Sequence, residues 1–493
     1  MVQPQLVPFN MTTSTTAMVR RTMGVGGLNE DVWTIVLEEL SSMTREEATH
    51  LLAAMRTCST LHKLGIKVLL DRDVVLDEVA TVISFCHFLA ANNYSRAHLW
   101  RSLVLKPFPI STTTSTALCA AMRHAIRLRK LTICGFDRLR YHVPEILEIM
   151  ANMRHIRELK VEAREPTTAL IGFLDTFRSN LTSVSIWEDQ ETKIYSHGGT
   201  PRAFNLLKHL RPSHSTLRSI YVHHLDMTGW DDIVLPEVRY LEAVAVSRIP
   251  ATDVLVRAFP KLTRLSLSGA VRYKANNHDA YVHCREANIQ AQNQRGKWSR
   301  LESVSGSMVD VFSLGLTCPL SWIFVYAERM SPDASRRMLQ TLLESAPKLP
   351  NLGFLTKEDI FGLGSDYSRR EYECERVEKT PGEREWLAKR TELSIRTIFD
   401  GYSDVLRDSA CTLKQIDMRI AIPCILCDWD CEDDDPEDSF TDCPILKQLR
   451  SHNLFDETSL LLRTVPTLRD IELRLMHNIE EVQILTRMVP PHQ

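Results

Sequence analysis

Four cysteines near the C-terminus have the side-chain chemistry of a metal site. Cys424, Cys427 and Cys431 follow one another closely, and Cys443 lies farther along the chain. Four thiolates can bind zinc tetrahedrally, and a Cys-x-x-Cys pair is common in such sites. The next gap, of three residues, is not that of a common zinc knuckle, and the surrounding aspartates and glutamates disfavour the thiolate form. The sequence favours a solvated acidic loop between two strands, with a zinc site as the alternative.

Two adjacent histidines and the known catalytic motifs are the remaining candidates for chemistry. His223 and His224 lie at the end of a predicted strand, with no cysteine or carboxylate at ligand spacing, so we expect surface or loop histidines. The sequence lacks a phosphate-binding loop, a nucleophile elbow and a zincin helix, and Gly362 and Gly364 lack the third glycine of a dinucleotide fingerprint. We therefore predict no enzyme, no catalytic residues, no metal and no cofactor.

Composition limits the class of protein. A chain of 493 residues exceeds the size of one core, which predicts two or three domains or one elongated repeat array. The net charge of −3 provides no basic field for nucleic acid. The longest uncharged run, between Asp310 and Glu328, is shorter than a membrane span, so we expect buried strands and no membrane association.

Cysteine usage and the N-terminus indicate the compartment. The 12 cysteines show no regular framework and no secretory signal accompanies them, which predicts reduced thiols in a cytoplasmic or nuclear protein. Residues 1–24 are rich in threonine and lack acidic residues, which is typical of a solvated disordered arm. A mitochondrial transit segment is the alternative interpretation of that composition.

Residues 25–76 form a predicted head of three short helices and a strand. Asn29 can cap the first helix, Thr44 to Glu47 form a capping box for the second, and Ser59 can cap the third. The apolar residues recur at helical spacing: Val32, Trp33, Val36, Leu37 and Leu40, then Ala48, Leu51, Leu52 and Met55, then Leu61, Leu64 and Val68. A strand at Val74–Leu76 is expected to follow.

This head resembles the F-box, which is common in fungal proteins with repeat bodies. The matching positions are Leu28, Glu30, Asp31, Val32, Trp33, Val36, Leu37, Leu40, Leu51, Leu52, Cys58 and Leu61. Asn29 departs from the family, which usually has a proline there; proline would only preorganise the helix start.

Residues 77–493 form a predicted body in which one phrase recurs, apolar-x-x-apolar-x-apolar. Copies begin at Trp100, Leu128, Ile156, Leu181, Leu217, Leu241 and Leu262, with further copies at Leu301, Leu349, Leu413 and Leu468. The early intervals lie near the 20–29 residues of leucine-rich repeats, and helical phrases fill the gaps. The body therefore resembles an irregular leucine-rich repeat, an α/β solenoid with a strand and a helix in each unit. Insertions at Arg272–Arg300 and Arg369–Arg396 interrupt or decorate it, and another α/β domain in the last third is the alternative.

The resemblance implies a function. An F-box head binds a Skp-type adaptor, which links to a cullin and its ubiquitin-conjugating machinery, while the repeat body binds a protein substrate; the chain would be the substrate-recognition subunit of an SCF-type ubiquitin ligase. The implied adaptor-binding residues are Leu28, Val32, Trp33, Val36, Leu37, Leu51, Leu52 and Met55. On this basis Leu37→Asp is expected to abolish adaptor binding and leave the body folded. The rival hypothesis is a ligase-independent scaffold whose helical head caps the solenoid.

Overall fold

The computed structural model divides the chain into two compact units, Met1–Val74 and Val75–Gln493. It describes residues 30–42, 48–109, 111–163, 168–188, 206–223, 225, 230, 233–244, 251–268, 278–327, 332–357, 399–409, 412–422, 450–477 and 480–488. The predicted N-terminal arm, the Thr44 capping box, the Arg369–Arg396 insertion and the four-cysteine segment lie outside these residues.

The smaller unit contains three helices, α1 (Glu30–Ser42), α2 (Ala48–Thr57) and α3 (Ser59–Asp71). Helix α3 packs against both α1 and α2. The crossing of α2 and α3 depends on Gly65, because a Cβ there would lie 2.3 Å from the Cγ of Met55. The predicted cap at Ser59 is wrong by one residue: Cys58 is extended, and its thiol accepts a hydrogen bond from the Leu61 amide at 3.5 Å.

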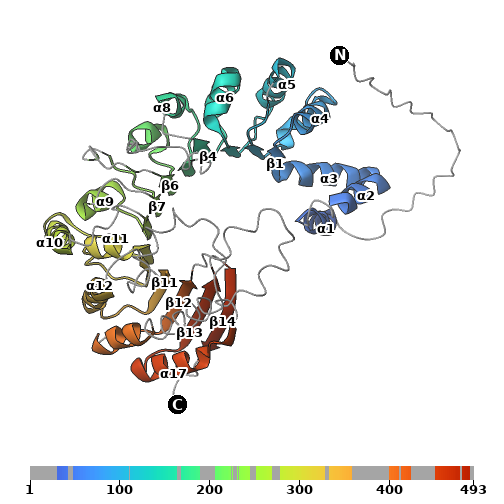
Figure 1. Ribbon diagram of the computed structural model, residues 1–493. Helices are drawn as coiled ribbons and strands as arrows, with labels where there is room; N and C mark the ends of the chain where they lie inside the picture. Colours follow the sequence, from blue (N-terminus) through green and yellow to red (C-terminus); the bar gives the residue numbers. More distant parts are fainter. Residues whose placement is uncertain are drawn as a thin grey trace, which may run out of the picture. The chain divides into compact units, whose positions relative to one another are not determined.

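The larger unit is built on a single sheet whose strands follow one another in chain order, and β2 to β13 pair in parallel (Figure 1). The strands are β1 (Asp73–Leu76), β2 (Ser102–Leu105), β3 (Lys130–Ile133), β4 (Glu158–Ala163), β5 (Ser183–Glu188), β6 (Ser219–His223), β7 (Tyr240–Val244), β8 (Arg264–Ser268), β9 (Ser303–Ser307), β10 (Trp322–Ala327), β11 (Asn351–Lys357), β12 (Gln415–Ile422), β13 (Asp470–His477) and β14 (Glu480–Met488). The last strand returns antiparallel to β13.

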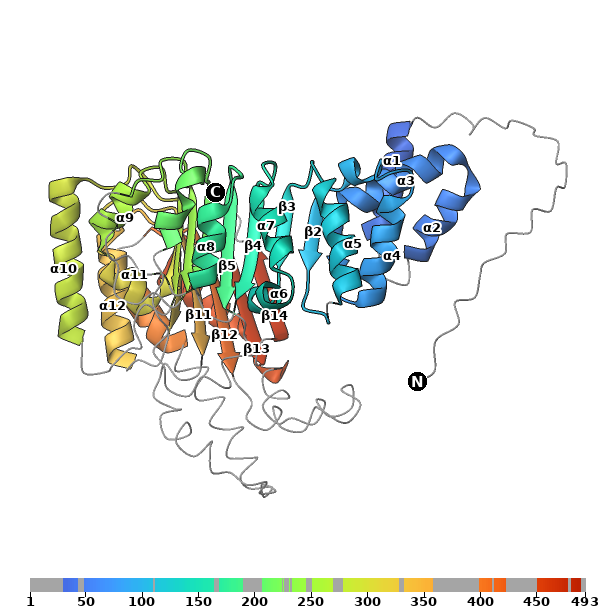
Figure 2. The ribbon, with the colours of Figure 1, turned by 90° about the horizontal axis from the view of Figure 1, so that it is seen from above.

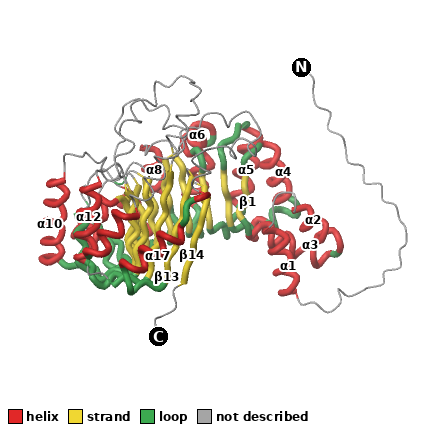
Figure 3. The backbone as a smooth tube through the Cα atoms, turned by 60° about the horizontal axis from the view of Figure 1, so that its bottom comes forward, coloured by secondary structure: helices red, strands yellow, loops and turns green. Residues whose placement is uncertain are grey.

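Helices connect the strands and cover one face of this sheet (Figure 2). They are α4 (Val79–Ala90), η1 (Ala97–Leu99), α5 (Thr112–Arg123), α6 (Phe136–His142), α7 (Pro144–Asn152), α8 (Thr168–Thr176), η3 (Leu206–Ser213), α9 (Thr252–Ala258), α10 (His278–Arg295), α11 (Met308–Ser313), α12 (Pro332–Ser345) and α17 (Leu454–Thr464), with residues 399–408 also helical. Figure 3 shows the strands as one continuous row with helices along its side. This α/β arrangement of strand and helix units in chain order agrees with a repeat solenoid.

The recurring phrase forms the core because each of its apolar positions has the same place in every unit. In one unit Leu128 precedes β3, and Leu131 and Ile133 lie on the strand face that meets the helices; all three are at most 1% exposed. Pairing in register places Leu131 beside Leu159 and Ile133 beside Val161. Parallel strands stacked in this way bury equivalent side chains against one another along the whole sheet.

A main-chain contact repeats from unit to unit. The carbonyl of Arg101, just before β2, accepts hydrogen bonds from the amides of Arg129 and Lys130 at 2.7 and 3.0 Å. The carbonyl of Arg129 does the same for Arg157 and Glu158. The main chain of this position thus joins consecutive units, and at Arg157 the side chain adds a hydrogen bond from Nη1 to the Asn180 carbonyl at 2.7 Å.

Two details of the predicted repeat require correction. The copy assigned to Leu241 begins three residues earlier, because the register pairs Ile220 with Leu241, so the unit reads Val238, Leu241 and Ala243. A unit was also missed: β10 carries Ile323 and Val325 in register with the neighbouring strands. The uncharged run from Asp310 contains the end of α11 as well as this strand, so only part of it is strand.

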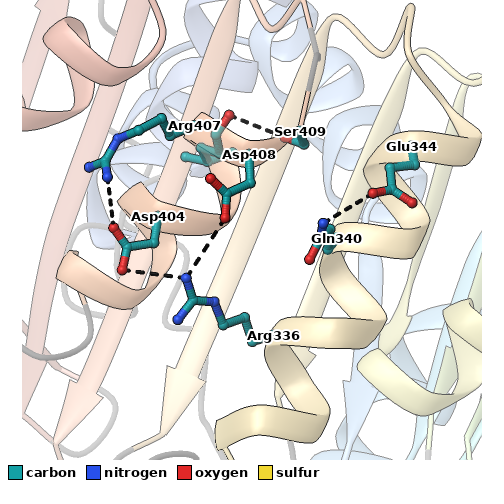
Figure 4. Close-up of polar contacts among 8 residues, drawn as sticks. Arg336, Gln340, Glu344, Asp404, Arg407, Asp408 and Ser409 are labelled. Carbon is teal, nitrogen blue, oxygen red and sulfur yellow. Dashed lines mark hydrogen bonds and ion pairs between the residues drawn. The ribbon is translucent and has the colours of Figure 1, made fainter.

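The predicted connecting helices also differ in part. The segment before Leu217 is the 3₁₀ helix η3, which contains Pro212. The described part of the predicted insertion at Arg272–Arg300 does not interrupt the array, because α10 lies between β8 and β9 and packs against α9 and α11. Farther along, Arg336 of α12 forms ion pairs with Asp404 and Asp408 of the helical residues 399–408, at 3.4 and 3.9 Å (Figure 4).

Candidate docking surfaces

The predicted adaptor-binding residues fall into two groups in the head. Leu37, Leu51 and Met55 are 0%, 1% and 7% exposed and belong to the core between the three helices. Val32, Val36 and Leu52 are 40%, 38% and 48% exposed. Trp33 is half-buried, and its indole nitrogen has no hydrogen-bond partner among the described residues. Leu28 lies outside the described residues.

The exposed apolar residues of α1 form one stripe. Val32, Ile35 and Val36 stand at i, i+3 and i+4, which places them on one side of a helix. Ile35, at 59% exposed, is the most accessible of them and is absent from the predicted set, although its spacing from Val32 was visible in the sequence. We call these three residues the α1 stripe. Helix α1 also carries four carboxylates, at Glu30, Asp31, Glu38 and Glu39, and no basic residue.

The body has a second surface, the inner face, which we define as the face of the sheet opposite the helices. One row of paired positions crosses it in register: Val104, Thr132, Lys160, Ser185, Tyr221, Glu242, Ser266, Ser305, Phe324, Gly353, Asp417 and Glu472. Apart from Val104 and Gly353 the row is polar or aromatic, in contrast to the aliphatic rows that face the helices. It provides many hydrogen-bonding and ring contacts for a partner.

An aromatic cluster lies in the first half of the inner face. The rings of Trp187 and Tyr221 stack with centroids 4.1 Å apart, and the Tyr221 hydroxyl lies 2.9 Å from Nε2 of His223. The Lys160 side chain lies over the Trp187 ring, with its Nζ 4.7 Å from the ring centroid. Burial, and then the Glu242 carboxylate, raise the pKa of Tyr221. The cluster is therefore a preassembled group of rings with a charged rim.

The prediction of a surface or loop histidine is wrong for His223. The residue lies within β6 and is only 8% exposed. Burial follows from the neighbouring rings, since the His223 centroid is 5.5 Å from Tyr221 and 5.7 Å from Trp187. His224 lies outside the described residues.

A different arrangement occupies the second half of the inner face. The Phe324 ring extends over Gly353, where a Cβ would lie 2.3 Å from the ring carbon Cδ2. Arg419 reaches to 5.5 Å from the same ring and makes two hydrogen bonds to Asp417, at 2.8 and 3.2 Å. The Asp417 and Arg419 charges are therefore satisfied by each other within the chain.

The described part of the chain contains no group of three or more histidine, cysteine or acidic residues placed to bind a metal ion. The four cysteines proposed from the sequence as a zinc alternative fall outside that part. Burial raises the pKa of the Cys86, Cys134 and Cys318 thiols to about 11, so they stay protonated at neutral pH and are poor nucleophiles and ligands. None of the described helices combines the length and hydropathy of a membrane span.

Comparison with known proteins yields little. No family model matches the chain, and no curated protein matches it. Among the solved structures that match is the crystal structure of the Rad7 and Elc1 complex in yeast, with 14% sequence identity over 67% of this chain and 94% of that chain, and a TM-score of 0.25. At that TM-score the likeness carries no argument about this chain.

Proposed function

We propose that the chain is the substrate-recognition subunit of an SCF-type ubiquitin ligase, in which the head binds a Skp-type adaptor and the body binds a protein substrate. The observation that carries this proposal is the α1 stripe: Val32, Ile35 and Val36 expose apolar surface on a helix whose sequence resembles the start of an F-box. An amphipathic helix docks into an apolar groove through residues at this spacing. The carboxylates of α1 would favour a basic rim on the adaptor.

The body supplies the second half of the proposal. Its inner face presents the Trp187 and Tyr221 rings, residue types that are enriched at the energetic centres of protein interfaces. In this function the chain makes and breaks no covalent bond. It holds a substrate near an enzyme that partners provide, so its contribution is proximity.

The test is a pulldown of the full chain with a purified Skp-type adaptor. Leu37→Asp is not the right variant, because Leu37 is fully buried and the change would unfold the head. Ile35→Asp with Val36→Asp places two charges in the α1 stripe on the surface. We expect an affinity loss of about 100-fold, since two central apolar contacts are removed.

The matched control is Tyr141→Asp, the same kind of change at a side chain that is 77% exposed in the body. We expect it to bind like wild type. Equal adaptor binding by the stripe variant and the wild type would contradict the assignment. Failure of a well-folded wild-type chain to bind any Skp-type adaptor would favour the alternative, a ligase-independent scaffold with a helical cap.

A further inference from the structure

The aromatic cluster of the inner face is a stack with two ends. The Trp187 ring on β5 lies between Lys160 of β4 and Tyr221 of β6, because β5 pairs with both of these strands. At the β4 end the Lys160 ammonium lies over Trp187, so a cation of the chain itself covers that ring face. At the β6 end Tyr221 is inclined to Trp187 by only 17°, so its second face is turned towards β7. Among the described residues no cation lies over this second face, and the other ring contact of Tyr221 is to His223 of its own strand.

A carboxylate stands at this open end of the stack. Glu242 of β7 is paired in register with Tyr221, and its Oε2 accepts a hydrogen bond from the Tyr240 hydroxyl. Burial, and then this hydrogen bond, raise the pKa of Tyr240, so the phenol stays protonated and leaves the charge of Glu242 in place. The three side chains are half-buried and can be reached from the inner face. The residue opposite Glu242 on β8 is Ser266, whose small side chain leaves room beside the carboxylate.

The cations of the surrounding strands do not neutralise Glu242. Arg264 of β8 has its Nε 3.2 Å from Oε2 of Glu302, which is its ion-pair partner. Lys160 is on β4, on the far side of the ring stack. By contrast, Asp417 of β12 forms an ion pair with an arginine of its own strand. Within the described residues Glu242 therefore has no ion pair, and since it is half-buried its charge is screened less than that of a fully exposed group.

We propose that the open end of the stack binds an arginine side chain of a partner protein, with the guanidinium stacked on the Tyr221 ring and hydrogen-bonded to the Glu242 carboxylate. Arginine suits this site better than lysine, because a planar guanidinium can stack on a ring and donate hydrogen bonds at its edge at the same time. The partner's cation would complete at one end of the stack what Lys160 does at the other. An arginine-bearing protein segment is then the substrate class of the inner face. That it is a substrate for ubiquitination rests on the proposed function, whereas the arginine site itself does not.

The probe is a fluorescein-labelled peptide with two arginines in a glycine-serine background, titrated into the full chain and followed by anisotropy. We expect saturable binding that Glu242→Gln weakens at least tenfold, because the amide oxygen still accepts from Tyr240 but the charge is lost. Tyr221→Leu removes the ring face and should weaken binding several-fold. The matched control is Glu472→Gln, the same change in the same row at a carboxylate that already has Arg474 as its ion-pair partner, and it should leave binding unchanged. Equal thermal melts of the variants establish that folding is not the cause.

The same peptide with citrulline in place of arginine tests the charge of the ligand, because citrulline keeps the shape of the side chain and is neutral. It should bind at least tenfold more weakly. Equal binding of the two peptides would overturn the proposal, and so would equal binding by wild type and Glu242→Gln, or no saturable binding by a well-folded wild-type chain.

The adaptor pulldown separates this site from the proposed function. Glu242→Gln should bind the adaptor like wild type, because the change is in the body. A wild-type chain that binds the arginine peptide and no adaptor would refute the ubiquitin-ligase proposal alone. A chain that binds the adaptor but does not distinguish arginine from citrulline would refute the arginine site alone.

Discussion

Arginines stand at the edge of the sheet where β2, β3 and β4 begin, and also in the strands β12 and β13, but the charges of the neighbouring residues differ between the two regions. We call the first region, with Arg101, Arg127, Arg129 and Arg157, the basic edge. In β12 and β13 the residue two positions before the arginine is acidic: Asp417 precedes Arg419, and Glu472 precedes Arg474. At the basic edge the residue two positions before Arg129 is another arginine, and that before Arg157 is a histidine. Positions two apart project to the same side of an extended chain. The charge of the residue two positions earlier thus decides whether a carboxylate of the same strand neutralises an arginine; Arg157, which lacks one there, donates instead to the Asn180 carbonyl at 2.7 Å.

A third environment in the body extends this comparison. Arg285 of α10 is only 5% exposed, and burial lowers the pKa of its guanidinium. It donates hydrogen bonds to the Phe312 carbonyl at 2.8 Å and to the Ser345 hydroxyl at 2.6 Å, and lies 5.0 Å from the Phe312 ring. Here an arginine joins α10, α11 and α12 without any carboxylate. The contribution of an arginine to stability should therefore follow the number of acceptors that the chain supplies to it.

The largest expected effect is at Arg285. Arg285→Met keeps most of the side-chain volume but removes two hydrogen bonds from a charged donor, to the Phe312 carbonyl and the Ser345 hydroxyl, so we expect a loss of about 2–3 kcal/mol in the free energy of unfolding. Urea denaturation followed by circular dichroism measures it. Arg127→Met is the matched control in the basic edge, where we expect a change within about 0.5 kcal/mol. Equal effects of the two substitutions would break the comparison.

An intermediate effect is expected at Asp417. Asp417 is 4% exposed, and Asp417→Asn directs an amide towards the Arg419 guanidinium in place of a carboxylate. We expect a loss of about 1–2 kcal/mol in the free energy of unfolding. The control is Glu302→Gln, which removes an exposed ion pair with Arg264 and should cost less than about 0.5 kcal/mol. An unchanged free energy of unfolding for Asp417→Asn would show that pairing within a strand does not distinguish the two regions.

The sequence predicted the fold where one local pattern decides the outcome. The phrase Leu128, Leu131 and Ile133 alternates with polar residues, so its strand and its buried face could both be predicted. The unit at β10 was missed because Trp322 and Phe324 occupy its polar positions and conceal the alternation. The unit at β7 was predicted three residues too late. Its third core position is the small residue Ala243, whereas Leu241, Val244 and Val246 match the phrase better.

The candidate surfaces were harder to predict because they depend on which of two apolar faces a helix buries. Helix α1 has one face with Leu37 and another with Val32 and Ile35; periodicity predicts the helix, but the packing of α2 and α3 selects the buried face. The basic edge was also missed. Its signal was present as Arg101, Arg129 and Arg157 at equivalent positions of consecutive repeats, yet it has meaning only once the strands are known to be adjacent and parallel.

The smallest expected effect concerns salt and the basic edge itself. Arg127→Gln with Arg129→Gln removes two of the four guanidiniums of the basic edge, and therefore part of their mutual repulsion. Because exposed charges are screened beyond about 10 Å at 0.1 M salt, we expect the variant to match or exceed wild-type stability by up to about 0.5 kcal/mol at low salt. The difference should vanish near 1 M salt, whereas the Asp417→Asn loss should largely persist, since Asp417 is buried. Parallel urea titrations at the two salt concentrations measure both. A double variant that is less stable than wild type at low salt would mean that these arginines already have anionic partners within the chain, and the contrast between the two regions would fail.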